Sequence, residues 1–193
     1  MKKIFFIIIS MFFAASLFAA NYSAFSEVKT ISSDFIMQRY VSIAKKPLTS
    51  LGKFYFERPG FLRWEYTKPF AHGILLDGKK AYSWKQIGDK KETQDISKQS
   101  FAKIMAKQIY IFVSMETEEI SKIYNIEERA DGIDLLPKDN SDKQTVKRIK
   151  LFFNKNKNAV VRVEIYDKSG DKTIISFTNT LLNHATPPNV LKP

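Results

Sequence analysis

The residue types that most often perform acid–base chemistry are scarce in this sequence. Histidine occurs only as His72 and His184, and neither has a second histidine at the spacing of a metal site. Asp34 and Glu57 could pair as two carboxylates in a cleft, but nothing in their spacing requires it. A structural role explains each histidine more simply. The sequence therefore predicts no catalytic residue and no metal site.

The chain has no cysteine, which excludes disulfides, thiolate metal sites and a cysteine nucleophile. It also excludes a lipid-modified cysteine at the start of a mature chain. Neither a glycine-rich phosphate loop nor the nucleophile elbow of hydrolases is present. We therefore predict a binding protein that is not an enzyme and that uses no cofactor.

The first twenty residues differ in character from the rest of the chain. Lys2 and Lys3 precede an apolar run over 4–18, which ends in two alanines before the polar Asn21. This order predicts a secretory signal peptide over residues 1–20 that is cleaved on export. The alternative is an uncleaved membrane anchor, but the run is short for a span of about 20 residues and has no stop-transfer flank. We therefore expect a periplasmic protein.

The charge balance is strongly basic. The formal net charge is +11, and subtracting the two charges of Lys2 and Lys3 leaves +9 on the exported chain. Export argues against nucleic acid as a partner, and the lysines are scattered rather than interleaved with aromatic residues. Two interpretations stay open, namely solubility and attraction to anionic lipid headgroups or to an acidic partner.

Most of the chain has the period-two alternation of β-strands. Arg58-Pro59-Gly60 forms one predicted turn, and Asp77-Gly78 forms a hairpin turn because glycine tolerates positive φ. A second such turn is Asp131-Gly132. The alternation predicts strands over residues 35–37, 52–57, 61–66, 74–76, 81–84, 124–128, 133–136, 146–153, 160–166 and 173–178.

Three segments have helical spacing instead. Tyr22, Phe25, Val28 and Ile31 predict a short amphipathic helix at the start of the exported chain. A second short helix is expected over 115–123, with Ser114 as its cap. The longest helical stripe lies in the middle of the chain and consists of Phe101, Ile104, Met105, Ile109, Phe112 and Val113.

These elements predict one mostly β domain over residues 21–193, with helices at its start and centre. A length of 193 residues suits a single domain, and the chain has neither an internal repeat nor a Gly/Ser linker. Antiparallel strands at intervals of about 8–12 residues are typical of a meandering sheet, a sandwich or a barrel.

Large aromatic side chains are abundant, with 16 Phe, 8 Tyr and 2 Trp in the full sequence. Phe54, Phe56, Trp64 and Tyr66 fall on strands, where large rings can either fill a core or line a cavity. The central helical stripe is long enough to cover the mouth of a curved sheet. Composition leaves the solid core and the cavity equally open.

The segment from Gly52 to Gly78 combines a glycine that opens a strand, the Arg58-Pro59 turn, Trp64 on the next strand, Pro69, and the Asp77-Gly78 hairpin. With these features in this order, the segment resembles the periplasmic lipoprotein carrier LolA family. The preceding strand and the later strands follow in the order of the family. The similarity extends over nearly the whole exported chain, although only this middle block is specific.

The resemblance implies an incomplete antiparallel β-barrel, or half-barrel, whose helical lid encloses an apolar cavity. Such carriers accept lipoproteins from an inner-membrane ABC exporter and pass them to an outer-membrane acceptor. The resemblance assigns Arg58 as a latch that bonds to backbone carbonyls of the lid in the closed state. The lid candidates are Phe101, Ile104, Met105 and Ile109, and the cavity candidates are Phe35, Phe54, Phe56, Leu62, Trp64 and Tyr66.

Two alternatives remain beside a monomeric lipoprotein carrier. One is a carrier of another lipid or glycolipid, and the other is a non-carrier envelope domain with a solid β core. The sequence departs from the family pattern after its Thr186-Pro187-Pro188 segment, where typical carriers continue into a further strand. The resemblance therefore does not extend to the restraint of membrane contact or to the identity of the acceptor.

Overall fold

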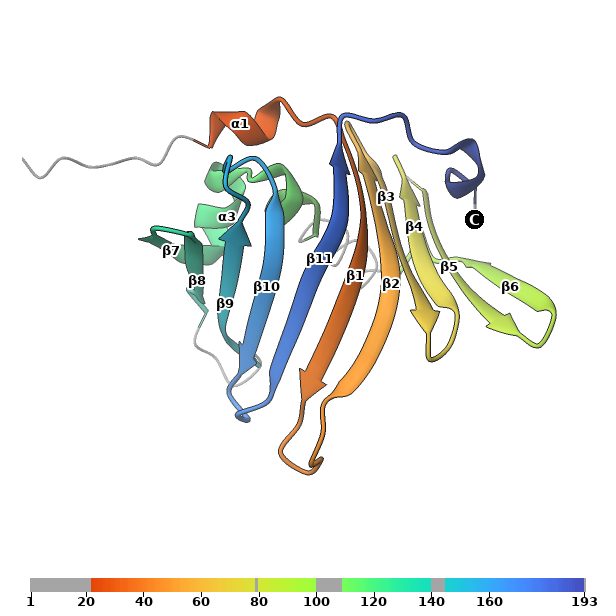
Figure 1. The fold of residues 1–193 in the computed structure, drawn as a ribbon, viewed down its shortest axis with the longest axis horizontal. Coiled ribbons are helices and arrows are strands. Elements are labelled where there is room, and N and C mark those ends of the chain that lie inside the picture. Colours follow the sequence, from red (N-terminus) through yellow and green to blue (C-terminus); the bar gives the residue numbers. More distant parts are fainter. Residues whose placement is uncertain (1–21, 79, 100–108, 140–144, 193) are drawn as a thin grey trace, which may run out of the picture.

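One curved antiparallel sheet dominates the structure (Figure 1). The computed structural model describes residues 22–78, 80–99, 109–139 and 145–192, and in these ranges eleven strands belong to that sheet. The predicted signal peptide and the lid candidates Phe101, Ile104 and Met105 lie outside the described residues.

The sheet grows outward from β1, which lies near its middle. The strand order is β6-β5-β4-β3-β2-β1-β11-β10-β9-β8-β7. The strands are β1 (Thr30–Tyr40), β2 (Leu48–Glu57), β3 (Phe61–Lys68), β4 (His72–Asp77), β5 (Lys80–Ile87), β6 (Lys90–Asp95), β7 (Tyr124–Arg129), β8 (Gly132–Pro137), β9 (Val146–Phe153), β10 (Val160–Asp167) and β11 (Lys172–Leu182).

The chain forms the two halves of the sheet one after the other, first β1 to β6 and then β7 to β11. It passes from β1 to the edge strand β6, crosses by helices to the other edge at β7, and returns to pair β11 with β1. Phe35 on β1 consequently lies opposite Gly52 on one side and Phe177 on the other. Since β6 and β7 do not pair with each other in the described chain, the sheet stays open. The predicted incomplete antiparallel barrel is confirmed.

Gly52 is required by the close approach of β1, β2 and β3. A Cβ atom there would lie 2.2 Å from the Glu65 carbonyl oxygen and 2.3 Å from Cζ of Phe35. The missing side chain lets the ring of Phe35 lie across β2. At the predicted hairpin between β4 and β5, Gly78 has φ +59°, which glycine adopts without strain.

The helices pack against the concave side of the sheet and at one of its ends (Figure 1). They are α1 (Ser23–Ser26), a helical segment at residues 109–114 and α3 (Thr117–Ile123), and a 3₁₀ turn covers Pro188–Val190. None of the helices in the described ranges is long and apolar enough to cross a membrane.

Two helical predictions need correction. The first helix ends at Ser26, so Val28 lies in the connection and Ile31 belongs to β1, where pairing with β2 and β11 satisfies its backbone. Ser114 does not cap α3, because its hydroxyl donates to the Tyr110 carbonyl of the preceding helix, 2.8 Å away. Glu116 occupies the cap position of α3 instead.

The apolar interior has two parts that meet on the concave face. One centres on β1, β2 and β3 and includes Phe35, Phe56 and Leu62. The other joins the helices to β8, β9 and β10, through residues such as Ile111 and Leu151. Val163 of β10 packs against both parts.

The strand β6 was missed by the sequence analysis. Its six residues, Lys90–Asp95, are all exposed and polar, so they have no apolar alternation to reveal a strand. All six residues of β6 pair with β5, and this pairing holds them in the extended conformation of a strand.

Candidate ligand-binding cavity

A cavity of about 940 Å³ lies on the concave side of the sheet. This volume is near the upper end of the roughly 300–1,000 Å³ typical of ligand sites. Strands from both halves of the sheet and the helical segment at 109–114 contribute to its wall, which is mostly apolar. The apolar members that line it include Ile31, Met37, Phe54, Trp64, Ile74, Ile109, Phe112, Val113, Ile149, Val163, Ile165, Ile175 and Phe177.

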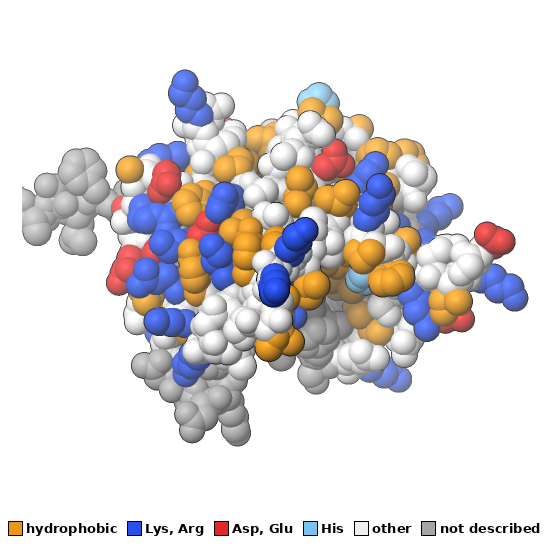
Figure 2. Space-filling view, turned by 60° about the horizontal axis from the view of Figure 1, so that its bottom comes forward, with side chains coloured by type: hydrophobic (Ala, Val, Ile, Leu, Met, Phe, Trp, Pro, Cys, Tyr) orange, Lys and Arg blue, Asp and Glu red, His pale blue; other side chains and the backbone are white. Residues whose placement is uncertain are grey.

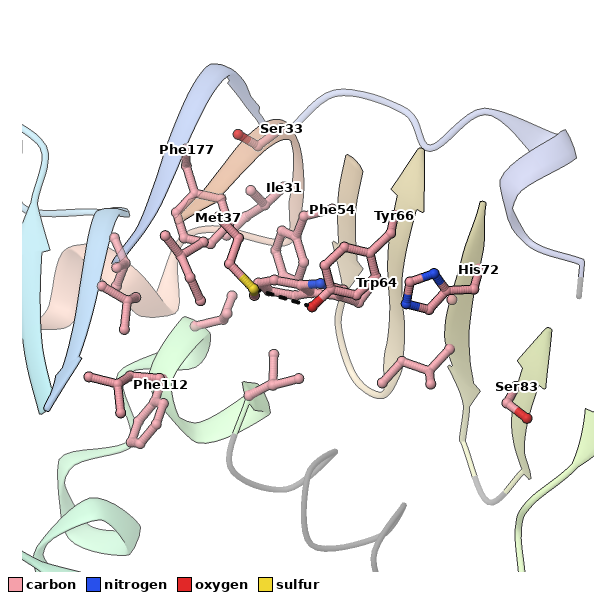
Figure 3. Close-up of a pocket in the computed structure, with 18 of the residues that line it drawn as sticks. Ile31, Ser33, Met37, Phe54, Trp64, Tyr66, His72, Ser83, Phe112 and Phe177 are labelled. Carbon is pink, nitrogen blue, oxygen red and sulfur yellow. Dashed lines mark hydrogen bonds between the residues drawn. The ribbon is translucent and has the colours of Figure 1, made fainter. Parts of the chain in front are cut away.

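The six cavity candidates all lie on the concave face, but they divide into two layers. Phe54, Trp64 and Tyr66 line the cavity, as Figure 3 shows. Phe35, with 1% of its surface exposed, lies beneath them, because its ring centroid is 4.6 Å from that of Trp64 and 5.4 Å from that of Tyr66.

Phe56 and Leu62 belong to the same buried layer as Phe35, and neither is among the residues that line the cavity. The ring of Phe56 is covered by Tyr110, with ring centroids 5.5 Å apart. These side chains support the rings above them and do not present a surface to a ligand.

None of the six cavity candidates lies on the other half of the sheet, which also lines the cavity. Its lining residues include Ile149, Val163, Ile165, Ile175 and Phe177 on β9, β10 and β11. Their period-two alternation was a signal that they share one face of each strand. Alternation within a strand does not tell which of the two faces is concave.

The helical segment at 109–114 forms the opposite wall. Ile109, the one lid candidate within the described residues, lines the cavity together with Phe112 and Val113. The buried Ile111 faces the sheet strands β8 and β9 instead. The helix ends where Met115 adopts φ +55°, a left-handed residue that commonly follows the last helical turn.

Arg58 connects three separate segments of backbone. Its Nε donates to the Val28 carbonyl oxygen at 3.0 Å, and its Nη2 donates to those of Phe25 and Ser114, each at 3.3 Å. The last turn of an α-helix leaves carbonyls without intrahelical partners. Arg58 therefore joins the β2–β3 turn to the end of α1 and to the end of the helical segment at 109–114.

The part of the cavity wall formed by described residues is close to electrically neutral. Burial raises the pKa of the Tyr66 phenol and that of the Tyr124 phenol, so both stay protonated at neutral pH. The Tyr66 hydroxyl lies 3.7 Å from the Met37 sulfur (Figure 3). The described wall contains one lysine, Lys85, and one glutamate, Glu92. The two form an ion pair, with Lys85 Nζ 3.1 Å from Glu92 Oε2.

Most lysine and arginine side chains of the described residues are exposed on the outside of the protein, and Arg63 is the buried exception among them. In Figure 2, lysine and arginine side chains are spread over the visible face among hydrophobic and acidic ones, rather than gathered on a single element. This distribution agrees with the scattered lysines of the sequence. The positive net charge of the protein is therefore not a property of the cavity wall.

The residues considered for chemistry are kept apart by the fold. Asp34 lies opposite Lys53 in the β1–β2 ladder, whereas Glu57 lies opposite Thr30. His72 stacks on Tyr66, with centroids 4.5 Å apart, and its Nδ1 is 2.9 Å from the Phe70 carbonyl oxygen. Across the described ranges, no three His, Asp or Glu side chains cluster as metal ligands would.

Comparison with known proteins agrees with this architecture. The family model described as outer membrane lipoprotein carrier protein LolA matches residues 26–192. An outer-membrane lipoprotein carrier protein of Chromobacterium violaceum is 30% identical over 165 residues, which cover 83% of this chain and 74% of that protein. Its counterpart in Nitrosospira multiformis is 27% identical over 175 residues, which cover 88% and 80%, respectively.

Among solved structures, the Pseudomonas aeruginosa MucA/MucB complex has a chain with a similar fold. The TM-score is 0.51 at 12% identity, and the match covers 89% of this chain and 58% of that chain. At this identity the likeness concerns the fold alone. The family match over residues 26–192 and the 30% identical carrier show that the chain belongs to the LolA family of outer membrane lipoprotein carrier proteins.

Proposed function

We propose that the chain takes up lipoproteins at the inner membrane and delivers them to the outer membrane, with their acyl chains held in the cavity. As a member of the LolA family it is a lipoprotein-binding carrier and not an enzyme. The observation that carries the proposal is the apolar cavity of about 940 Å³ between the sheet and the helical segment at 109–114.

The physical reason is the cost of exposing acyl chains to water. Each buried CH₂ group contributes about 0.8 kcal/mol, so a lipoprotein with several chains needs an apolar container to cross an aqueous compartment. Rings of Phe54, Trp64 and Phe177 form one continuous apolar wall, with centroids 5.5–6.0 Å apart. Aliphatic side chains of β9 and β10 extend this wall.

The proposed setting is the periplasm, where carriers of this family act. Residues 1–20 serve as a cleaved signal peptide in this proposal, and residues 21–193 form the carrier domain. An inner-membrane ABC exporter supplies the cargo, and an outer-membrane acceptor receives it from a monomeric carrier.

Arg58 is proposed to act as a latch on the helices. Its guanidinium has five donors and a permanent charge, which suits it to hold several carbonyl oxygens together. The three carbonyls that it contacts belong to segments that border the concave side. A ligand that separates the helices from the sheet must break these contacts, so they favour the empty, closed state.

Replacement of Arg58 by leucine is expected to leave the protein folded and to slow cargo release about tenfold, which corresponds to about 1.4 kcal/mol. Without the latch, the closed state loses stability relative to the loaded state, so loading persists and release is impaired. Stopped-flow transfer of a fluorescent triacylated lipopeptide from loaded protein to excess vesicles measures this rate.

Arg39→Leu is the matched control for this experiment. The Arg39 side chain is 56% exposed, and its ion pair with Asp171 is long at 4.0 Å. Loss of its charge should not change the release rate. If Arg58→Leu releases cargo as quickly as the unmodified protein, Arg58 is not a latch.

Purification of the protein from envelope extracts, followed by mass spectrometry of the bound material, tests the proposed function. Triacylated lipoproteins are expected. Recovery of lipids or glycolipids alone would replace the proposal with a carrier of another lipid, and a protein that binds neither would overturn both carrier hypotheses.

A further inference from the structure

The concave face changes from apolar to polar as it passes from β3 to the edge at β6. Strand pairing places Tyr66, His72, Lys85 and Glu92 opposite one another in a single row across four strands. Side chains in such a row lie on the same face of the sheet. The row starts at an aromatic ring in the cavity and ends at a charged pair.

The neighbouring row changes in the same direction. Trp64 lies opposite Ile74, Ile74 opposite Ser83, and Ser83 opposite Gln94. Figure 3 shows the progression from Phe177 and Trp64 to His72 and Ser83 along the sheet. We name the polar end of these two rows the polar wing, and it consists of His72, Ser83, Lys85, Glu92 and Gln94.

The polar wing is part of the same cavity as the apolar wall. All five of its side chains belong to residues that line the cavity, beside Trp64 and Ile74. Ser83 is half-buried, whereas the positions of β6 are exposed. A single ligand can therefore contact the apolar wall and the polar wing together.

The charges of the polar wing cancel locally. Lys85 Nζ lies 3.1 Å from Glu92 Oε2, and these two residues are the lysine and the glutamate of the described wall. Three members remain: Ser83 and Gln94 are neutral groups that both donate and accept hydrogen bonds, and the His72 ring stacks on Tyr66 with its Nδ1 2.9 Å from the Phe70 carbonyl oxygen. Such a surface matches an amide segment, whose groups both donate and accept hydrogen bonds, better than it matches a phosphodiester, since an anion requires a cation that is not already paired.

We propose that the polar wing binds the uncharged amide segment that follows the acylated residue of a lipoprotein, and that the pairing of Lys85 with Glu92 selects against anionic phospholipids. This inference rests on the proposed function, because it concerns the polar part of the same cargo. It assigns a second role to the cavity, namely discrimination between a lipoprotein and an anionic phospholipid that carry similar acyl chains.

The selectivity has a simple physical origin. An acyl chain of a lipoprotein and an equally long acyl chain of a phospholipid gain the same free energy from the apolar wall, so the wall cannot distinguish one chain from the other. A phosphate placed beside the polar wing meets Glu92 as well as Lys85 and gains little net attraction. An amide segment keeps its hydrogen bonds, which would otherwise be lost when it leaves water.

The test compares three probes that carry the same two acyl chains, namely an N-acetylated S-diacylglyceryl-cysteinyl peptide amide without charged residues, a diacylglycerol and a phosphatidylglycerol. Ser83→Ala combined with Gln94→Leu is expected to weaken binding of the lipopeptide about tenfold and to leave diacylglycerol binding unchanged. Ser83→Ala removes only the hydroxyl, and Gln94→Leu keeps the approximate size of the side chain. Affinities are measured by displacement of a fluorescent fatty-acid probe.

Glu92→Gln gives the complementary result. Lys85 then has no paired anion, so affinity for phosphatidylglycerol is expected to rise about tenfold at low salt and to fall again as salt screens the charge. Binding of the uncharged lipopeptide should change less than twofold. Glu118→Gln, on the exposed surface of α3, removes an equal charge away from the cavity and serves as the control.

The outcomes separate the inference from the proposed function. If the acylated probes bind but neither set of substitutions changes the preference among them, the polar wing is only a solvated sheet edge and the inference is wrong. If no acylated probe binds the unmodified protein, the proposed function fails and the inference fails with it.

Discussion

Replacement of Val163 by glutamate is expected to weaken the binding of a triacylated lipopeptide about 100-fold, which corresponds to about 2.7 kcal/mol. Val163 lies near the middle of the concave face and packs against both parts of the apolar interior. A carboxylate there would lose its hydration when acyl chains fill the cavity, and such a loss costs several kcal/mol without a compensating partner. Titration with the fluorescent lipopeptide measures the change.

The control places the same acid on the opposite face of the sheet. Ile36 of β1 is also β-branched, but it is 40% exposed and points to the convex side, since its neighbours Phe35 and Met37 face the concave side. Ile36→Glu should bind the lipopeptide normally. Equal losses in the two variants would mean that the effect comes from unfolding or from net charge, and not from the cavity.

Truncation of Phe35 to alanine is expected to lower the free energy of unfolding by about 3–5 kcal/mol. The ring is 1% exposed and lies under Trp64 and Tyr66, in the space that Gly52 leaves open. Removal of the ring leaves a void in the middle of β1, where both neighbouring strands are fixed by pairing. Chemical denaturation monitored by tryptophan fluorescence reports the loss, because Trp64 contacts Phe35.

Phe70→Ala is the matched control for this truncation. Phe70, in the loop between β3 and β4, has 76% of its surface exposed. Loss of an exposed ring should change the free energy of unfolding by no more than about 0.5 kcal/mol. If Phe35→Ala proves as mild as Phe70→Ala, the layer beneath the cavity does not support the sheet as the packing indicates.

The alternation of large residues in the sequence predicted ten of the eleven strands of the described sheet and placed the candidates of each strand on a common face. Phe54, Phe56, Leu62, Trp64 and Tyr66 do share the concave face. Their division into lining rings and buried supports could not be read from the sequence. Which ring covers which depends on how β1, β2 and β3 approach one another, and that approach is set by Gly52 and by strand register.

Local sequence patterns predicted the wrong secondary structure at positions where strand pairing in the folded sheet outweighs local preference. Ile31 continues the helical spacing of Tyr22 and Phe25, yet it lies in β1 because β2 and β11 offer its backbone two ladder partners. The reverse holds for β6, whose polar residues have no strand signal of their own and become ordered by pairing with β5.

The sequence by itself determined the mostly antiparallel architecture and the hairpin at Asp77-Gly78. It also determined the absence of cysteine chemistry and the resemblance to lipoprotein carriers. All four depend on residue type and short-range spacing. Only the tertiary structure decided which face of each strand is concave, which carbonyls Arg58 contacts, and that His72, Ser83 and Lys85 share one wall with Trp64. The reason is that alternation defines two faces within each strand, whereas the curvature of the sheet and the register between strands choose the face that surrounds the cavity.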